Sequence, residues 1–233
     1  MQIGSKLPDT SPEPLKTTLK RFCIVVVFGI AFGYIEAAVV VYLRTIFYPD
    51  GFTFPLTEFG IVTSPLWKRL LLTEIGREAA SMVLISTTAW LVGRNLQQRT
   101  AFFLTIFAFW DIFYYIWLKI LINWPGSIMD WDILFLIPTA WASPVLAPVL
   151  ISLTLLLFAI IILYRCSCVS PLKVAPMEWF GFILAGLLVV GSFCYAGQHI
   201  TKPDFKSHFY WPLFALGEIL AIALFLKCLW KSK

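Results

Sequence analysis

Residues 109–119, FWDIFYYIWLK, place an acid and a base in a segment that is otherwise aromatic and aliphatic. Asp111, Tyr115 and Lys119 are spaced by four residues, so a helix would align them along one face. A carboxylate, a phenol and an amine in such a row can exchange protons or bind a charged group. The segment therefore predicts a polar stripe that begins deep in an apolar environment, with Tyr114 beside it.

Further acidic residues lie in or next to apolar segments, and they could share in the same chemistry. Glu74 and Glu78 are one helical turn apart, and Asp132 belongs to the sequence DWD. Carboxylates of this kind act as general acids and bases, or bind hard divalent ions such as Mg²⁺, Mn²⁺ or Ca²⁺. The predicted catalytic residues are Glu36, Glu78, Asp111 and Asp132.

Basic side chains near these acids suggest how a substrate would be held. Arg44, Arg77 and Lys119 could bind a phosphate or carboxylate head group, and the tyrosines could orient it. A charged residue at membrane depth costs about 2.5–3.5 kcal/mol even on insertion scales, so each needs a partner or water. Acids outnumber bases at this depth, which indicates shared protons, a bound metal or a cationic ligand. The predicted substrate-binding residues are Arg44, Arg77, Tyr114, Tyr115, Lys119 and Glu218.

The composition indicates that a membrane surrounds these residues. Of 233 residues, 60% are hydrophobic and only 13% are charged, and the mean hydropathy is +0.84. Soluble domains carry about 25% charged residues, and a soluble fold of this size could not hide so much apolar surface. The net charge of +5 does not indicate nucleic acid, because the basic residues are scattered at the ends of the apolar segments.

The apolar runs predict an all-α membrane protein with six transmembrane helices. Residues 1–21 are polar and basic and predict a flexible cytoplasmic tail, whereas 22–230 form one polytopic transmembrane domain. Residues 124–144 contain prolines and an apolar core too short to span, so we expect a re-entrant or interfacial segment after the third helix. The predicted helices cover 22–44, 71–93, 101–123, 145–164, 176–197 and 210–230.

The distribution of basic residues predicts the orientation. Most of the 18 Lys and Arg fall on one side if the N-terminus is cytoplasmic, and the loop after 101–123 has none. The positive-inside rule then places both termini in the cytoplasm of a multi-pass plasma-membrane protein. In this orientation the acidic residues of the candidate site lie in the outer half of the membrane, in a pocket that opens outward.

The absence of several known motifs argues against the kinds of site that they form. The chain has no P-loop, no G-x-S-x-G and no H-E-x-x-H sequence. The two histidines, His199 and His208, fall in one outer loop, where they could join carboxylates at a metal or be ordinary loop residues.

Three functions remain after these exclusions. We favour an intramembrane enzyme that acts on a lipid or isoprenoid, because a pocket at this depth is reached from the bilayer. The alternatives are a proton- or cation-coupled transporter, and a structural membrane protein whose buried charges are packing ion pairs. Membrane lipids and a small-molecule or lipid ligand are the expected partners, and nucleic acid is not.

Overall fold

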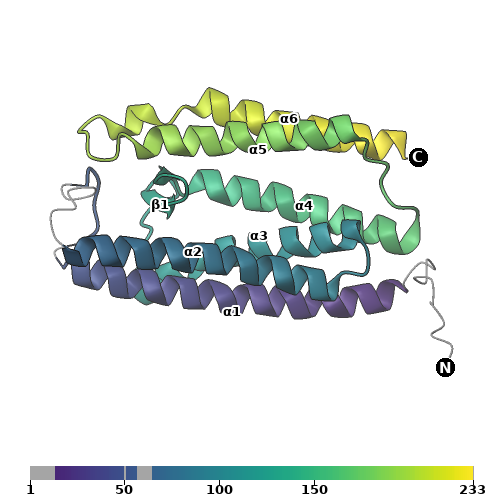
Figure 1. The fold of residues 1–233 in the computed structure, drawn as a ribbon, viewed down its shortest axis with the longest axis horizontal. Helices are drawn as coiled ribbons and strands as arrows, with labels where there is room; N and C mark the ends of the chain where they lie inside the picture. Colours follow the sequence, from purple (N-terminus) through teal and green to yellow (C-terminus); the bar gives the residue numbers. More distant parts are fainter. Residues whose placement is uncertain (1–13, 50, 57–64, 233) are drawn as a thin grey trace.

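The structure is a computed structural model in which residues 14–49, 51–56 and 65–232 are described. Long helices lie side by side along one axis, and successive helices run in opposite directions (Figure 1). The start of α1 and the end of α6 therefore lie at the same end of the bundle. In chain order the elements are α1 Leu15–Phe47, α2 Pro65–Val92, α3 Leu96–Ile122, β1 Trp131–Phe135, β2 Trp141–Pro144, α4 Leu146–Cys168, α5 Pro176–Gly197, the 3-10 helix η1 Phe205–His208, and α6 Trp211–Lys231.

Five helical segments of the described chain are long and apolar enough to cross a membrane. They are α1, α3, α4, α5 and the segment Phe205–Lys231, which contains α6. The protein is therefore a mainly helical membrane protein, as the composition predicts. Five candidate spans are fewer than the six expected. The difference is α2, whose first half carries Lys68, Arg69, Glu74, Arg77 and Glu78.

The helix bounds differ from the predicted ones mainly at the N-terminal ends. Helix α1 begins at Leu15, inside the stretch 1–21 that the sequence predicts as a flexible tail, and residues 1–13 of that stretch lie outside the described residues. Helix α3 begins at Leu96, five residues before the predicted start. The Asn95 side chain accepts a hydrogen bond of 2.9 Å from the Gln98 backbone N–H, which is an N-cap.

The segment 124–144 contains a β-hairpin, which an all-α fold does not include. Strands β1 and β2 pair antiparallel, and Asp132 lies opposite Ser143. The preceding loop caps the next helix, because the Val145 and Leu146 backbone N–H groups donate to the carbonyls of Asp130 and Ile128. Paired strands satisfy the backbone of a stretch whose prolines prevent a helix.

Glycines allow α1 to pack closely against α3. A Cβ on Gly29 would lie 2.9 Å from the Cβ of Phe109, and one on Gly33 would lie 2.9 Å from the Trp110 carbonyl oxygen. Such contacts are shorter than packed atoms tolerate, so this face of α1 requires glycine. The spacing Gly29–Gly33 is the G-x-x-x-G pattern of close helix pairs in membranes. The close approach also positions Glu36, one turn further along α1.

A Gly33→Ala substitution should lower the thermal unfolding temperature of the purified protein in detergent. The added methyl group meets the backbone of α3, which cannot move without separating the two helices. The matched control is Gly76→Ala on α2, where no atom lies within 4 Å of the added Cβ. Alanine favours a helix over glycine by about 1 kcal/mol, so this control should be neutral or stabilising. Equal losses in both variants would contradict the close-packing argument.

Helices α5 and α6 pair with each other and form a separate layer above α4 (Figure 1). They join the other helices at a few points. At one end, the C-terminus of α5 touches the hairpin, since a Cβ on Gly197 would overlap the Ala140 carbonyl oxygen. Further along, the Phe158 and Phe225 rings stack with centroids 4.0 Å apart. The space between these points is the cavity that carries the candidate site.

Candidate functional site

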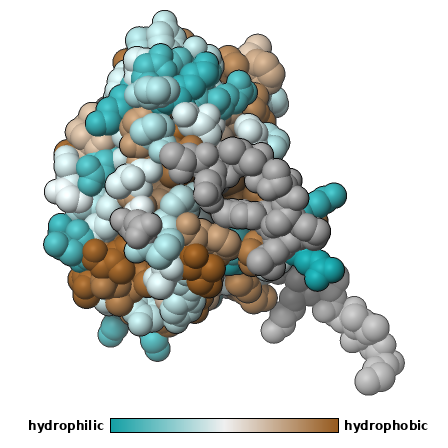
Figure 2. Space-filling view, turned by 90° about the vertical axis from the view of Figure 1, so that its left-hand side faces the viewer, coloured by the Kyte–Doolittle hydropathy of each residue, from teal (hydrophilic) through white to brown (hydrophobic). Residues whose placement is uncertain are grey.

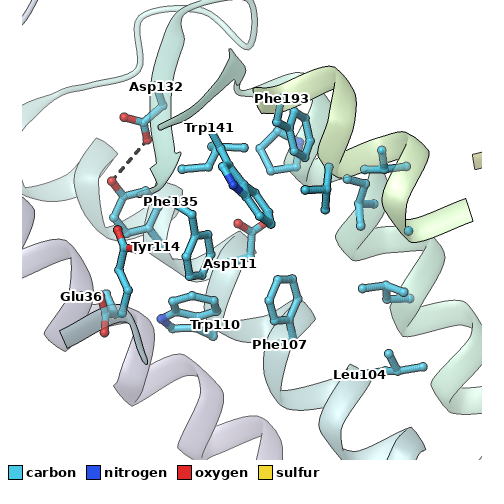
Figure 3. A pocket seen from close by; sticks show the side chains of 18 of the residues that line it. Glu36, Leu104, Phe107, Trp110, Asp111, Tyr114, Asp132, Phe135, Trp141 and Phe193 are labelled. Atoms are coloured by element: carbon cyan, nitrogen blue, oxygen red, sulfur yellow. Dashed lines mark hydrogen bonds between the residues drawn. The ribbon is translucent and has the colours of Figure 1, made fainter. Parts of the chain in front are cut away.

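A cavity of about 690 Å³ lies between the α5–α6 pair and the rest of the bundle. Its volume is in the range of small-molecule sites, about 300–1,000 Å³. Most of the wall is aliphatic and aromatic, as the side chains of Leu104, Phe107 and Phe193 show (Figure 3). Polar side chains gather toward the β-hairpin, where Glu36, Asp111, Tyr114 and Asp132 line the wall. An apolar body with one polar end is the shape that suits an amphiphile.

Arg44 and Asp132 form a buried ion pair at the polar end. The Arg44 Nη2 to Asp132 Oδ1 distance is 2.9 Å, and the two side chains are 9% and 3% exposed. The Tyr114 hydroxyl donates to the other carboxylate oxygen of Asp132 at 3.2 Å (Figure 3). The Arg44 guanidinium lies 4.2 Å from the centroid of the Phe52 ring and 3.9 Å from that of Trp124.

The Asp132 carboxyl is buried in a setting of low dielectric constant. Burial raises its pKa above the ordinary value, and the charge of Arg44 opposes that rise. Its carboxylate also accepts a 2.9 Å hydrogen bond from the Ile133 backbone N–H. With three donors around it, Asp132 is a fixed anchor for Arg44.

A second ion-pair cluster connects α1 to α2. The Arg77 guanidinium pairs with Glu36 through Nη1 and with Glu74 through Nε, the latter at 2.8 Å. Ser81 donates to the remaining oxygen of Glu36 at 2.6 Å. Arg77 is thus shared by two acids, and its charge is already compensated within the protein.

Three carboxylates on the cavity wall have no basic partner within 4 Å among the described residues. Glu78 accepts a hydrogen bond from the Leu136 backbone N–H at 2.9 Å, which ties α2 to the hairpin loop. Asp111 accepts from the Ser152 hydroxyl at 2.7 Å, and Glu218 accepts from a threonine hydroxyl of α4 at 2.8 Å. Each accepts a hydrogen bond from one neutral donor and forms no ion pair among the described residues.

Several buried donor atoms near these carboxylates have no hydrogen-bond partner among the described residues. They are Nε and Nη1 of Arg44, the Tyr115 hydroxyl, and the indole nitrogens of Trp110 and Trp141. All four residues line the cavity. A buried donor without a partner costs about 1–3 kcal/mol, so such a group indicates a site that a ligand can complete.

The structure brings nine of the ten predicted site residues to the wall of this cavity. Lys119 is the exception. It is exposed, and its Nζ donates to the backbone carbonyls of Asn123, at 3.4 Å, and Pro125, at 3.0 Å. The helix ends at Ile122, so Lys119 lies in the last turn, where a cation stabilises the free carbonyls. The predicted stripe therefore ends at Tyr115.

Residues that the sequence analysis did not single out complete the site. Ser81 and Ser152 orient carboxylates, Thr154 does so for Glu218, and Trp141 from β2 reaches over Asp111 (Figure 3). The hydroxyls carry a usable signal, because Ser and Thr within apolar spans often hydrogen-bond to another helix. Trp141 carries no such sequence signal, because its position depends on the hairpin.

The two histidines are together but away from the cavity. Their rings stack with centroids 4.0 Å apart beside Tyr195, at the connection between α5 and α6. This connection lies at the top of Figure 2, where the surface is mainly hydrophilic. No group of three His, Cys, Asp or Glu side chains that could hold a metal is found in the described part of the chain. A divalent metal at the candidate site stays a prediction.

The site is thus an apolar cavity with two ion-pair clusters, one around Arg44 and one around Arg77. Three carboxyl groups outside any ion pair and several free buried donors also line it. These features can bind a long apolar molecule and exchange a proton with its polar end. Comparison with protein-family models, with curated proteins and with solved structures finds no match for this chain.

Proposed function

We propose that the protein is an intramembrane enzyme that binds an amphiphile of lipid or isoprenoid type and performs acid–base chemistry on its polar end. The observation that carries this proposal is Asp111, a carboxyl group outside any described ion pair at the polar end of an otherwise apolar cavity. An ion-pair role does not explain it, because no basic side chain described here lies within 4 Å. That structural role does explain Glu36 and Asp132, which pair with Arg77 and Arg44.

The polar groups take different parts in this chemistry. Asp111 is the group that accepts or returns a proton, and the Ser152 hydroxyl holds it in position. The Tyr115 hydroxyl and the free N–H groups of Arg44 donate hydrogen bonds to acceptor atoms of the amphiphile. Glu36 and Asp132 are positioning residues that hold the two arginines, and Glu78 holds the hairpin loop. General acid–base catalysis by one such group contributes about 10²–10⁴ in rate.

In this proposal α2 is a sixth membrane span. The start of α1 and the end of α6 both lie at the cytoplasmic face of the plasma membrane. Two observations support this topology: α2 runs beside α1 and α3 (Figure 1), and the start of α1 and the end of α6 lie at the same end of the bundle. Charged side chains of α2 face the cavity and find partners there, as Arg77 does with Glu36, so they would not contact lipid. The hairpin and the polar end of the cavity then face outward.

Labelling of single cysteines in intact cells should report this orientation. In a background without the five native cysteines, Lys202→Cys at the hairpin end should react with an impermeant thiol reagent. Ser170→Cys, an exposed position at the opposite end, should react only after the cells are opened. The reverse pattern would invert the topology and move the polar end of the cavity to the cytoplasmic side.

The enzyme proposal is tested by incubating the purified protein with a total membrane lipid extract and analysing products by mass spectrometry. The wild type should retain bound lipid and convert at least one amphiphile, whereas Asp111→Asn should bind without conversion. If a folded wild-type protein retains no lipid and forms no product, the proposal is refuted. The matched control is Glu74→Gln, which removes a wall carboxylate that is already paired with Arg77.

One observation favours transport as the second candidate. The cavity wall continues from the hairpin end to Gln97, Leu172 and Cys228, which lie at the opposite end of the helices. A cavity that reaches both ends could pass an amphiphile along its length. Movement of unconverted lipid between the leaflets of liposomes, without any product, would favour this candidate over the enzyme.

A further inference from the structure

Acidic side chains outnumber basic ones on the cavity wall. Two cations, Arg44 and Arg77, line it together with six carboxylates, so the acids exceed the bases by four. The carboxylates are Glu36, Glu74, Glu78, Asp111, Asp132 and Glu218. Both arginines already pair with acids. An anion entering this cavity would find no cation without an acidic partner, whereas a cation could pair with the carboxyl groups.

Aromatic rings surround Asp111. Five of them follow one another along the cavity wall, and we name this set the aromatic arc: Phe107, Trp110, Phe135, Trp141 and Phe193. Successive ring centroids are 5.4, 6.0, 5.3 and 6.1 Å apart. Figure 3 shows Asp111 among these rings, below Trp141. The rings come from α3, both hairpin strands and α5.

We infer that the polar end of the cavity recognises a positively charged organic head group, an amine or quaternary ammonium, within the aromatic arc and beside Asp111. The inference rests on the proposed function and names the class of its amphiphile. Ring faces carry negative electrostatic potential, and they attract cations whose substituents are apolar. The carboxylates of Asp111 and Glu218 supply the opposite charge.

The same walls disfavour the other ligand classes. A small metal ion needs several oxygen ligands at one centre, whereas aromatic rings provide none. An anionic head group would have only the free N–H groups of Arg44, whose charge Asp132 already compensates. An ammonium that carries a proton can give it to Asp111, so recognition and proton transfer use one carboxylate.

The test compares three amphiphiles of equal chain length. The full-length protein in a neutral detergent is titrated with octyltrimethylammonium, with its neutral carbon isostere, and with octyl phosphate, and tryptophan fluorescence reports binding. The wild type should bind the ammonium at least tenfold more tightly than either of the others. Asp111→Asn and Trp141→Leu should each remove most of this preference. Asp204→Asn, on a carboxylate that is 66% exposed and does not line the cavity, should keep it.

The variants separate recognition from folding and from the proposed function. Thermal unfolding confirms that each variant is folded, and Glu218→Gln replaces Asp111→Asn if the latter does not fold. Equal affinity for the ammonium and the isostere, or a preference for octyl phosphate, would overturn the inference while leaving an amphiphile site in place. Failure of all three probes to bind a folded wild type would contradict the amphiphile proposal as well.

Discussion

Asp111→Asn should reduce turnover of the amphiphile by about 10²–10⁴-fold while the protein stays folded. Asparagine has nearly the same shape, and its carbonyl oxygen can still accept the Ser152 hydrogen bond of 2.7 Å. No described basic side chain within 4 Å loses a partner, so the substitution leaves no buried cation behind. The measurement is product formation by mass spectrometry, with thermal unfolding in detergent as the readout of folding.

Ser152→Ala is the control that separates chemistry from positioning. It removes the donor that orients Asp111 but leaves the carboxylate, so turnover should fall by less than in Asp111→Asn. A neutral hydrogen bond contributes about 0.5–1.5 kcal/mol, which corresponds to roughly a two- to tenfold effect. If Asp111→Asn unfolds the protein and Ser152→Ala does not, Asp111 has a packing role and the acid–base assignment is wrong.

Helical periodicity is what made much of this site predictable. Residues four apart on one helix share a face wherever the helix lies, so Asp111 and Tyr115 could be assigned to one cavity from their spacing. The apolar runs likewise indicated the helices, because length and hydropathy are local properties. The same reasoning failed for Lys119, because its side chain donates to the backbone carbonyls after the last turn of α3 and does not turn toward the cavity.

Contacts between distant parts of the chain were not predictable in this way. Arg44 and Asp132 are 88 positions apart, and their pairing depends on a hairpin that the apolar core of 124–144 did not reveal. A short apolar run is equally consistent with a strand or part of a helix. The aromatic arc depends on the same hairpin, because Phe135 and Trp141 reach the cavity from its two strands.

The α1–α3 contact differs from these cases, since its sequence signal was present. Gly29 and Gly33 form a G-x-x-x-G pattern inside an apolar run. The pattern shows that a close helix neighbour is needed, but it does not identify the neighbour. The structure supplies that information, because the atoms that meet the glycines belong to α3.

Breaking the Arg44–Asp132 pair should be strongly destabilising. Arg44→Met leaves a buried carboxylate without its cation, and Asp132→Asn leaves a buried guanidinium without its anion. Each change should lower the free energy of unfolding by about 3–5 kcal/mol, as expected for one partner of a buried pair. The measurement is denaturant unfolding in detergent. Lys227→Gln, on an ion pair whose lysine is 58% exposed, should have a far smaller effect.

The double variant Arg44→Met/Asp132→Asn tests whether the pair acts as a unit. Removing both charges leaves no uncompensated ion, so the loss should fall short of the sum of the single losses by about 0.5–3 kcal/mol. Additive losses would show that each residue acts through other contacts, such as the rings against Arg44 or the Tyr114 hydrogen bond to Asp132. A coupled result would support Arg44 as a group fixed in place before ligand binding. Its free N–H groups would then meet a ligand without the entropy cost of ordering a long side chain.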